Sequence, residues 1–487
     1  MTQQAPAPAL STPEATAPRR DLVSRSLTVA PYVFLGVLLL LLVRRFAAPV
    51  TNADTFFHLR YGHEFLHGWS IWHPGHVSTL GQRDWVPTQW ASQVAMAAME
   101  SWFGLAGVAW LAGTLALATA VATFLVARRH ADPLPSAVVT VLASMALSSS
   151  LSPRPQVVSY LLVLLVTQTW LRTAEDLRPR WWLVPVTWAW ASLHGMWPLA
   201  ALIGLVAVLG IALDRQPERR TSMARLVAVP VLCLVAGGLS PVGPRLYGAV
   251  LLVGGRSRFH TEWGPTDFHA LQAMVAAGMV ALTLVGWLRA PRGAVTWTPL
   301  LLLLLAAGWS AYAVRTVPVA AMMTVPLLAA ALQRLAPRRA APARERAVVA
   351  LVALGALAAL TASVPFTADQ PPDVPSWLDP ELDRLPAGST VQTTDVFGGY
   401  LLWRHPRLNP VIDGYSDAYT TRHLQEQLDL QELRPGWDRT LSRSGARIAM
   451  LPSRSGLAYA LTRLEGWRTV HRSADVVLLS APPGWSR

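Results

Sequence analysis

The chain contains no lysine, because all 41 of its basic residues are arginine. This absence excludes the lysine of a Walker A phosphate loop, a Schiff-base lysine and a catalytic Ser-Lys pair. Cysteine is nearly absent as well, and the single cysteine, Cys233, lies within an apolar run. One thiol forms no disulfide within a chain, no multi-thiolate zinc site and no iron-sulfur cluster, so these three are also excluded.

Charge is scarce along the chain. Only 14% of the 487 residues are charged whereas 52% are hydrophobic, which is more apolar surface than a soluble domain of this size needs for its core. We therefore expect an integral membrane protein. Eleven apolar runs have roughly the length of a membrane span, and they occupy residues 28–47, 105–127, 134–151, 156–171, 182–197, 199–213, 224–240, 270–288, 297–313, 316–333 and 347–364.

Arginine placement predicts how these spans are oriented, since cytoplasmic loops retain cationic residues. With the N-terminus inside, the inner loops hold most arginines of the membrane half and the outer loops hold few. Eleven crossings then place the segment around Asp54, and everything after about residue 365, outside the plasma membrane. Residues 365–487 contain 13 arginines against 14 acids, so topology accounts for the net charge of +13 and no nucleic-acid partner is expected.

Three regions flank the expected transmembrane domain of residues 28–364. Residues 1–27, rich in Ala, Pro and Thr, predict a disordered cytoplasmic tail before a first span that is retained rather than cleaved. The first outer loop, residues 48–104, is long enough to be structured. Residues 365–487 begin with a proline-rich linker and predict a small extracytoplasmic α/β domain. Its expected strands are 389–393, 411–412, 448–451 and 476–479, and its expected helices are 396–404, 417–432 and 455–465.

The polar segment directly after the first apolar run is the strongest candidate for chemistry. It reads Asn52-Ala-Asp54-Thr-Phe-Phe-His58-Leu-Arg60-Tyr-Gly62, with an acid, an imidazole and a guanidinium within seven residues at a membrane boundary. Such groups are costly to place there and indicate a functional site. Partial burial at this position suits Asp54 for general-base work beside His58. The alternative interpretation is that Asp54 caps a helix over residues 56–65.

Arginines at the outer ends of spans are candidates for holding an anionic lipid phosphate. Arg154 lies in Ser152-Pro-Arg-Pro-Gln156, Arg245 follows Pro244, and Arg315 precedes Thr-Val-Pro318. A guanidinium suits two-pronged recognition of phosphate, and Arg60 is a fourth candidate in the polar segment. The alternative is that each arginine merely reaches toward lipid headgroups.

Other outer residues are candidates for a substrate pocket. Glu262, next to Trp263, is a second candidate catalytic acid. His194 lies at the outer end of a span, where a histidine also serves helix packing. Tryptophans of the first outer loop also suit the membrane interface, where indole rings are stable. The pocket candidates are Asn52, Asp84, Trp85, Trp90 and His194.

Several motifs together resemble bacterial polytopic membrane proteins of the GT-C glycosyltransferase superfamily. They are Asp54-Thr-Phe-Phe-His58-Leu-Arg-Tyr-Gly62, Trp85-Val-Pro-Thr-Gln-Trp90, Arg154-Pro-Gln156, Trp190-Ala-Ser-Leu-His-Gly195, Glu262-Trp263 and Arg315-Thr-Val-Pro318. In the tail, Phe397-Gly-Gly-Tyr-Leu-Leu-Trp403 and Val411-Ile-Asp-Gly-Tyr415 resemble the outer domain of that group. The likeness extends over nearly the whole chain and supports fold and enzyme class more than substrate.

The resemblance implies a transferase of the cell envelope that moves a sugar from a polyprenyl-phosphate donor to a glycan, lipid or protein acceptor at the outer face of the bilayer. Asp54 would be the general base, the reaction would invert the anomeric carbon, and outer arginines would stabilise the departing phosphate. A divalent cation is possible as a cofactor. Asn52 stands where the group usually has an acid, and Gly75 replaces another, which weakens the case for that metal.

Two other functions remain open at this point. A transporter or flippase of lipid-linked sugars would also use outer arginines, although such proteins usually show internal repeats and acids at mid-membrane. A non-catalytic scaffold of envelope assembly would be consistent with Asn52 and Gly75. In the tail, Asp395, Asp413 and Asp417 with Tyr400, Trp403 and Tyr415 either contact an acceptor glycan or serve as ordinary turn, cap and packing residues.

Overall fold

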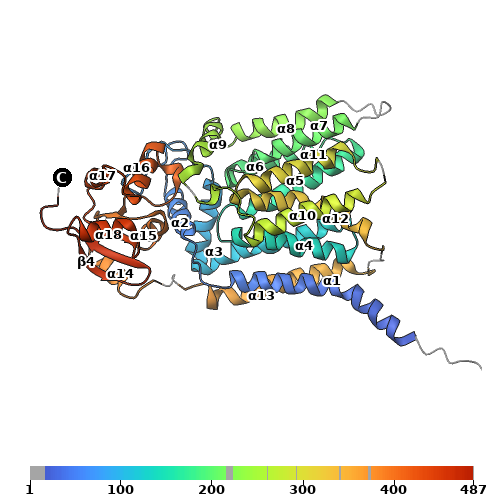
Figure 1. Ribbon diagram of the computed structural model, residues 1–487, viewed down its shortest axis with the longest axis horizontal. Coiled ribbons are helices and arrows are strands. Elements are labelled where there is room, and N and C mark those ends of the chain that lie inside the picture. The colour runs from blue at the N-terminus through green and yellow to red at the C-terminus, as the bar shows by residue number, and fades with distance from the viewer. Residues whose placement is uncertain are drawn as a thin grey trace, which may run out of the picture.

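The computed structural model consists of a bundle of long helices with a smaller α/β domain at one end of it (Figure 1). It describes residues 17–214, 223–259, 261–291, 293–338, 342–370 and 374–485, with side chains from residue 28 onward except at 253, 254 and 261. The N-terminal helix extends away from the far end of the bundle, and the C-terminal residues lie in the α/β domain.

The helices of the bundle follow the apolar runs closely. Within the described residues, seven helical segments are long and apolar enough to cross a membrane, and four shorter apolar helices accompany them. The expected polytopic helical architecture is therefore confirmed, although length alone identifies seven spans rather than eleven. The elements are α1 (Ala17–Phe46), α3 (Trp90–Ala127), α4 (Pro133–Leu147), α5 (Val157–Asp176), α6 (Leu183–Leu193), α7 (Leu199–Leu213), α8 (Met223–Gly238), α10 (Leu271–Leu288), α11 (Trp297–Tyr312), α12 (Val317–Leu335) and α13 (Glu345–Thr367).

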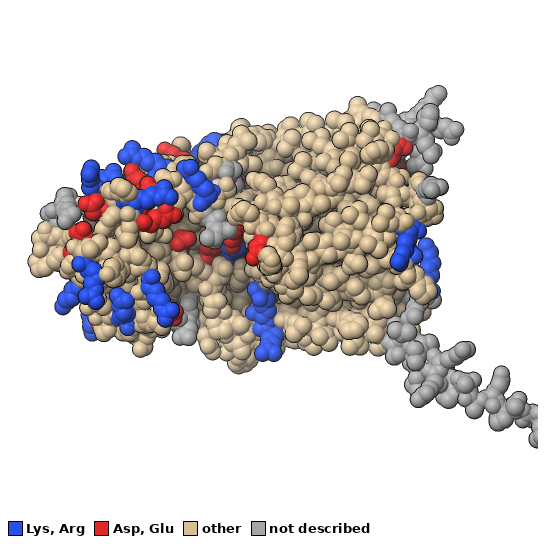
Figure 2. All heavy atoms as spheres, in the orientation of Figure 1, with Lys and Arg blue, Asp and Glu red and all other residues tan. Residues whose placement is uncertain are grey.

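The surface of the bundle matches a lipid environment. Figure 2 shows an almost uncharged surface over the helices, with arginines and acids gathered over the α/β domain and at the opposite end of the bundle. Helix α12 lies at the centre, with 83% of its apolar window buried, whereas α13 is at the periphery with 22% buried. Lipid can cover apolar side chains on an outer helix as well as protein can, so both helices suit a membrane protein.

The N-terminus departs from the sequence prediction. Helix α1 begins at Ala17, so residues 17–27 of the expected disordered tail are helical, and the rest of that tail lies outside the described residues. The last turn of α1 contains Arg44 and Arg45. Cations are favourable there because they lie next to the exposed carbonyl groups of the helix end.

The loop of residues 48–104, predicted to be the first outer loop, packs between the bundle and the α/β domain. Its helix α2 (Ala53–Leu66) packs against the start of α3 on one side and against α15 (Asp395–Arg404) on the other. Gly62 allows the approach to α3, because a Cβ atom there would lie 2.1 Å from the carbonyl oxygen of Gln93. Helix α2 is therefore held rigidly between the two parts of the molecule.

The α/β domain contains one mixed five-stranded sheet in the order β2-β1-β3-β5-β4. Strand β1 (Thr390–Gln392) is parallel to β2 (Asn409–Pro410) and β3 (Ile448–Pro452), whereas β5 (Val476–Ser480) is antiparallel to β3 and to the edge strand β4 (Arg468–Arg472). The sequence did not predict β4, because its polar residues are mostly exposed. The remaining helices are α14 (Leu378–Asp383), α16 (Thr421–Gln431), α17 (Trp437–Ser444) and α18 (Gly456–Arg463).

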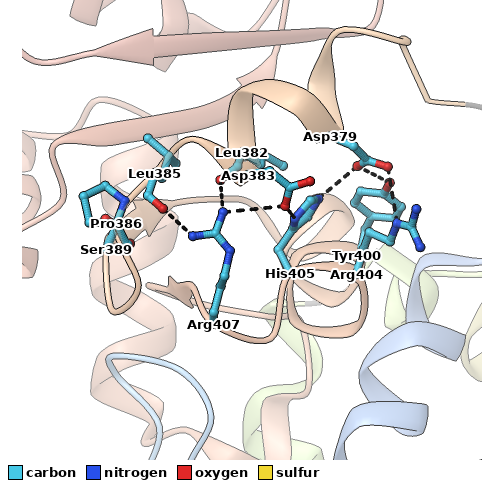
Figure 3. Close-up of polar contacts among 10 residues, drawn as sticks. All are labelled: Asp379, Leu382, Asp383, Leu385, Pro386, Ser389, Tyr400, Arg404, His405 and Arg407. Carbon is cyan, nitrogen blue, oxygen red and sulfur yellow. Dashed lines mark hydrogen bonds and ion pairs between the residues drawn. The ribbon is translucent and has the colours of Figure 1, made fainter.

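A buried histidine joins α14 to the end of α15 (Figure 3). The Nε2 atom of His405 lies 2.9 Å from Asp379 and the Nδ1 atom lies 3.1 Å from Asp383. Tyr400 donates a hydrogen bond of 2.7 Å to Asp379, and Arg407 donates to the carbonyl oxygens of α14 and the turn after it. This polar cluster fixes α14 on the domain, and so orders the chain where it leaves the proline-rich linker.

A buried acid, Asp413, lies where the α/β domain meets α2. Tyr61 of α2 donates a hydrogen bond of 2.8 Å to its Oδ2 atom, and the backbone N–H of Tyr415 donates one of 2.8 Å to its Oδ1 atom. Asp413 is fully buried, and this burial raises the pKa of its carboxyl group from 3.8 to about 6 despite those hydrogen bonds. The residue thus fastens the domain to α2 rather than facing a ligand.

The raised pKa of Asp413 predicts that the stability of the folded chain depends on pH. Because the pKa is higher in the folded than in the unfolded chain, the folded state holds the proton more tightly between about pH 4 and pH 6, and the contribution of Asp413 to stability falls as the pH rises through that window. At about 1.4 kcal/mol for each pKa unit, the loss reaches about 3 kcal/mol. We expect Asp413→Asn to gain stability relative to the native chain by up to this amount between pH 4 and pH 7, measured by denaturant unfolding in detergent. A constant difference across that range would contradict the prediction.

Candidate functional site

A cavity of about 870 Å³ lies where the end of the bundle meets α2 and the α/β domain. Its polar wall comes from α2, from the turns before α5 and α12, and from residues 414–417 of the α/β domain. Its apolar wall comes from α7, α11 and α12, and its residues include Leu199, Leu202, Leu304, Leu305, Trp309 and Val319. The cavity therefore has a polar end and an apolar side, as a binding site for an amphipathic ligand would.

Helix α2 presents two polar side chains to this cavity. Asn52 is the N-cap, since its side-chain oxygen accepts a hydrogen bond of 3.1 Å from the backbone N–H of Asp54. The capping role proposed as the alternative for Asp54 thus belongs to Asn52, and the Asp54 carboxylate lines the cavity. His58 follows four residues later, which places it on the same face of the helix.

Arg154 connects the carboxylate of Asp54 to a second acid. Its Nη1 atom donates a hydrogen bond to Oδ2 of Asp54, and its Nη2 atom donates one of 2.9 Å to Glu262. Arg315 donates a further hydrogen bond of 3.0 Å to Glu262 and lies over the Trp263 ring, 5.6 Å from its centroid. The side chain of Arg154 is 8% exposed, whereas those of Asp54 and Glu262 are 38% and 39% exposed.

The two arginines and two acids balance one another in charge. An entering phosphate would compete with the carboxylates for the guanidinium groups, which are suited to two-pronged binding of either anion. Such a ligand would therefore change the hydrogen bonding of Asp54, although Asp54 and the phosphate need not touch. In the described part of the chain, the second carboxylate oxygen of Asp54 has no partner and remains free for another group.

The side chains around Asp54 do not form a set suited to a divalent cation. The guanidinium group of Arg154 lies between the two acids, and Asn52 uses its side-chain oxygen as a helix cap. Among the described residues, no three His, Cys, Asp or Glu side chains gather as metal ligands would. The possible cation implied by the family resemblance therefore finds no matching ligand set here.

The structure brings together six of the twelve predicted site residues. These are Asp54, His58, Arg154, His194, Glu262 and Arg315, all of which line the cavity. The Nδ1 atom of His194 lies 2.8 Å from the hydroxyl oxygen of Ser159, which also accepts a hydrogen bond of 2.8 Å from Trp190. His194 thus has a packing role in addition to its place in the wall.

The other six predicted residues do not line this cavity. Arg60 pairs with Glu64 at 2.8 Å. It follows Asp54 by six residues, which is a rotation of about 240° around the helix axis, so Arg60 lies on another face of α2. Arg245 donates hydrogen bonds to the backbone carbonyls of Trp72 and Trp85 and so holds the first outer loop. Asn52 is a helix cap and Trp90 is the first residue of α3, whereas Asp84 and Trp85 line a smaller neighbouring pocket of about 150 Å³.

Two further residues of the cavity come from the tail, where the sequence left open both contact with an acceptor and an ordinary structural role. Asp395 and Asp417 line it from the α/β domain, and Thr88 donates a hydrogen bond of 2.7 Å to Asp417. By contrast, Tyr400, Trp403 and Asp413 lie in the packing between that domain and α2, as the structural interpretation of the tail expected. Gln93, which contacts His58, gave no signal in the sequence because a lone glutamine in a helix carries no motif.

Comparisons with known proteins identify the fold. A scan of protein-family models finds no match, and a comparison with curated protein sequences finds none either. Among solved structures, the chain is similar to the archaeal oligosaccharyltransferase AglB from Archaeoglobus fulgidus in complex with an inhibitory peptide and a dolichol-phosphate, with a TM-score of 0.57, 9% identity and coverage of 93% of this chain and 75% of that one.

Two structures of ArnT from Cupriavidus metallidurans are also similar. The apo form has a TM-score of 0.54 at 14% identity and covers 96% of this chain and 99% of that one. The form bound to undecaprenyl phosphate has a TM-score of 0.52 at 15% identity, with coverage of 97% and 100%. The chain therefore has the fold of the polytopic membrane glycosyltransferases of the GT-C superfamily, as its motifs led us to expect.

Proposed function

We propose that the protein is a membrane glycosyltransferase that moves a sugar from a polyprenyl-phosphate donor to a hydroxyl group of an acceptor at the outer face of the plasma membrane. The observation that carries this proposal is the meeting, in one cavity, of a carboxylate with a free oxygen, two arginines and an apolar wall. The fold supports it, since two of the similar structures contain dolichol-phosphate or undecaprenyl phosphate.

Each part of the cavity has a place in this reaction. The isoprenoid chain lies along the apolar side chains of α7 and α11, which remove it from water. The donor phosphate binds at Arg154 and Arg315, which are aimed at the negative charge that develops on it. The acceptor enters between α2 and residues 414–417, on the side of the cavity lined by Asp395 and Asp417.

Asp54 then acts as the general base. As the acceptor oxygen attacks the anomeric carbon, its proton passes to the Asp54 carboxylate. The bond from that carbon to the phosphate oxygen breaks, and its electron pair stays on the phosphate, where the guanidinium groups stabilise it. Because the acceptor and the leaving phosphate occupy opposite sides of the sugar, the configuration inverts.

A structure determined with undecaprenyl phosphate, together with glycan analysis, tests the proposal. We expect the phosphate to lie within hydrogen-bonding distance of Arg154 and Arg315, and mass spectrometry of the cell envelope to show one glycan lacking its sugar in a deletion strain. A phosphate bound elsewhere would refute the donor site. An unchanged envelope would refute the transferase, and accumulation of the complete lipid-linked sugar inside the membrane would favour a flippase.

Metal removal gives a further expected outcome. Arg154 lies between Asp54 and Glu262, and in the proposed reaction its guanidinium group exchanges these carboxylates for the leaving phosphate and stabilises its charge. We expect sugar transfer by the purified protein to stay within about twofold of its original rate after treatment with EDTA and exchange into metal-free buffer. A loss of activity that Mg²⁺ or Mn²⁺ restores would contradict this.

A further inference from the structure

His58 is enclosed on the wall of the cavity. The residue is only 3% exposed, and its ring packs against the rings of Phe57 and Tyr415, with centroids 4.4 Å and 5.6 Å away. Burial, and then the positive charge of Arg154, lower the pKa of His58 well below its usual value. The ring is therefore neutral near pH 7 and carries one proton, on either Nδ1 or Nε2.

Gln93 determines which nitrogen carries that proton. This glutamine lies in the first turn of α3, is completely buried, and places its amide Nε2 atom 3.1 Å from Nδ1 of His58. In the orientation that the structure gives this amide, its N–H group donates, so Nδ1 of the ring accepts and the proton is on Nε2. In the described part of the chain, no residue pairs with Nε2 of His58, while the ring itself lines the cavity.

We propose that Gln93 is a positioning residue that holds His58 in its Nε2–H form, so that the ring donates a hydrogen bond to the phosphate of the donor. This inference rests on the proposed function and adds a third recognition element to it. The groups whose charge acts on the His58 ring are Arg154, His194 and Arg315, and we place the two arginines at the phosphate. An N–H group there adds a directed hydrogen bond without a further positive charge, whereas the other tautomer would turn a lone pair toward an anion.

Affinity for undecaprenyl phosphate, measured on the full chain in nanodiscs, tests this arrangement in a double-mutant cycle. Gln93→Met removes the amide with little change in volume, and we expect Kd to rise roughly three- to tenfold, the range of one hydrogen bond. His58→Gln supplies an amide N–H group that does not depend on Gln93. In that background, we expect Gln93→Met to change Kd less than twofold. An equal loss in both backgrounds, or no loss in either, would overturn the proposal.

The matched control is Gln168→Met. Gln168 is another buried glutamine in contact with a histidine, since its Oε1 atom lies 2.6 Å from Nε2 of His130, but neither residue lines this cavity. We expect this variant to bind undecaprenyl phosphate like the native chain. A loss equal to that of Gln93→Met would mean that any buried glutamine has this effect, and would refute a specific role for Gln93.

A spectroscopic measurement tests the tautomer without any ligand. In the protein labelled with 15N-histidine, the signals of His58, identified by their absence in His58→Gln, report which ring nitrogen is protonated. We expect a proton on Nε2 in the native chain and a mixture of tautomers in Gln93→Met. A proton on Nδ1 in the native chain would overturn the inference. If the native chain failed to bind undecaprenyl phosphate while the proton was on Nε2, the proposed function would fail and the tautomer would stand.

Discussion

Replacing Asp54 with asparagine is expected to slow sugar transfer by about a hundredfold to ten-thousandfold, the usual contribution of a general base. The substitution keeps the shape of the side chain but removes its ability to accept the proton of the acceptor hydroxyl. It also frees Arg154 from one of its two acids. We therefore expect affinity for undecaprenyl phosphate to be unchanged or higher, so that the rate falls without a loss of affinity.

The control for this prediction is Asp267→Asn. Asp267 contacts His269, and its side chain is 66% exposed. It lies outside the cavity, so the same chemical change there should leave both rate and affinity within about twofold, in keeping with the small effects of exposed substitutions. Transfer by Asp54→Asn at more than a tenth of the native rate would exclude Asp54 as the base.

The membrane fold could be predicted from the sequence because its cause is local. Apolar runs of spanning length follow one another with arginine-rich connections, and each helix satisfies its own backbone hydrogen bonds. The α/β domain was harder to predict from the sequence, as strand β4 illustrates. Its residues Arg468–Arg472 are mostly exposed at the edge of the sheet, so the only apolar signal came from its partner β5.

The candidate site likewise contains a part that could be predicted from the sequence and a part that could not. Asp54 and His58 are one helical turn apart, so the sequence itself places them on one face. Arg154 reaches Asp54 across 100 residues of sequence and Glu262 across 108, and no spacing rule predicts such contacts. Arg245 was predicted to bind phosphate only because of its expected outer location, but it donates hydrogen bonds to backbone carbonyl groups of the first loop instead.

Gln93 illustrates a further limit of sequence reasoning. Its contact with His58 depends on the close approach of α2 and α3, which requires the absence of a side chain at Gly62. A glycine within a helix indicates such an approach but does not identify the partner helix. Residues that act through another side chain therefore become visible only once the helices are placed.

Replacing Arg154 with glutamine is expected to weaken binding of undecaprenyl phosphate by about tenfold to a hundredfold, because hydrogen bonds to charged groups contribute about 1.5–3 kcal/mol. The rate of transfer should fall as well, since the same guanidinium stabilises the leaving phosphate. Lysine at this position restores the charge but lacks the planar fork that allows arginine to bind phosphate through two parallel hydrogen bonds, so Arg154→Lys should give an intermediate Kd. Arg60→Gln, on another face of α2 and paired with Glu64, is the matched control and should bind like the native chain.

Combining Arg154→Gln with Asp54→Asn separates two reasons for such a loss. If Arg154 served only to neutralise Asp54, removing both charges would restore affinity, because no uncompensated carboxylate would remain near the phosphate. If Arg154 binds the phosphate itself, the double variant stays as weak as Arg154→Gln, since the lost hydrogen bonds have no substitute. We expect the second result. Full recovery of affinity would leave Arg315 as the arginine that holds the donor and reduce Arg154 to a structural bridge between α2 and Glu262.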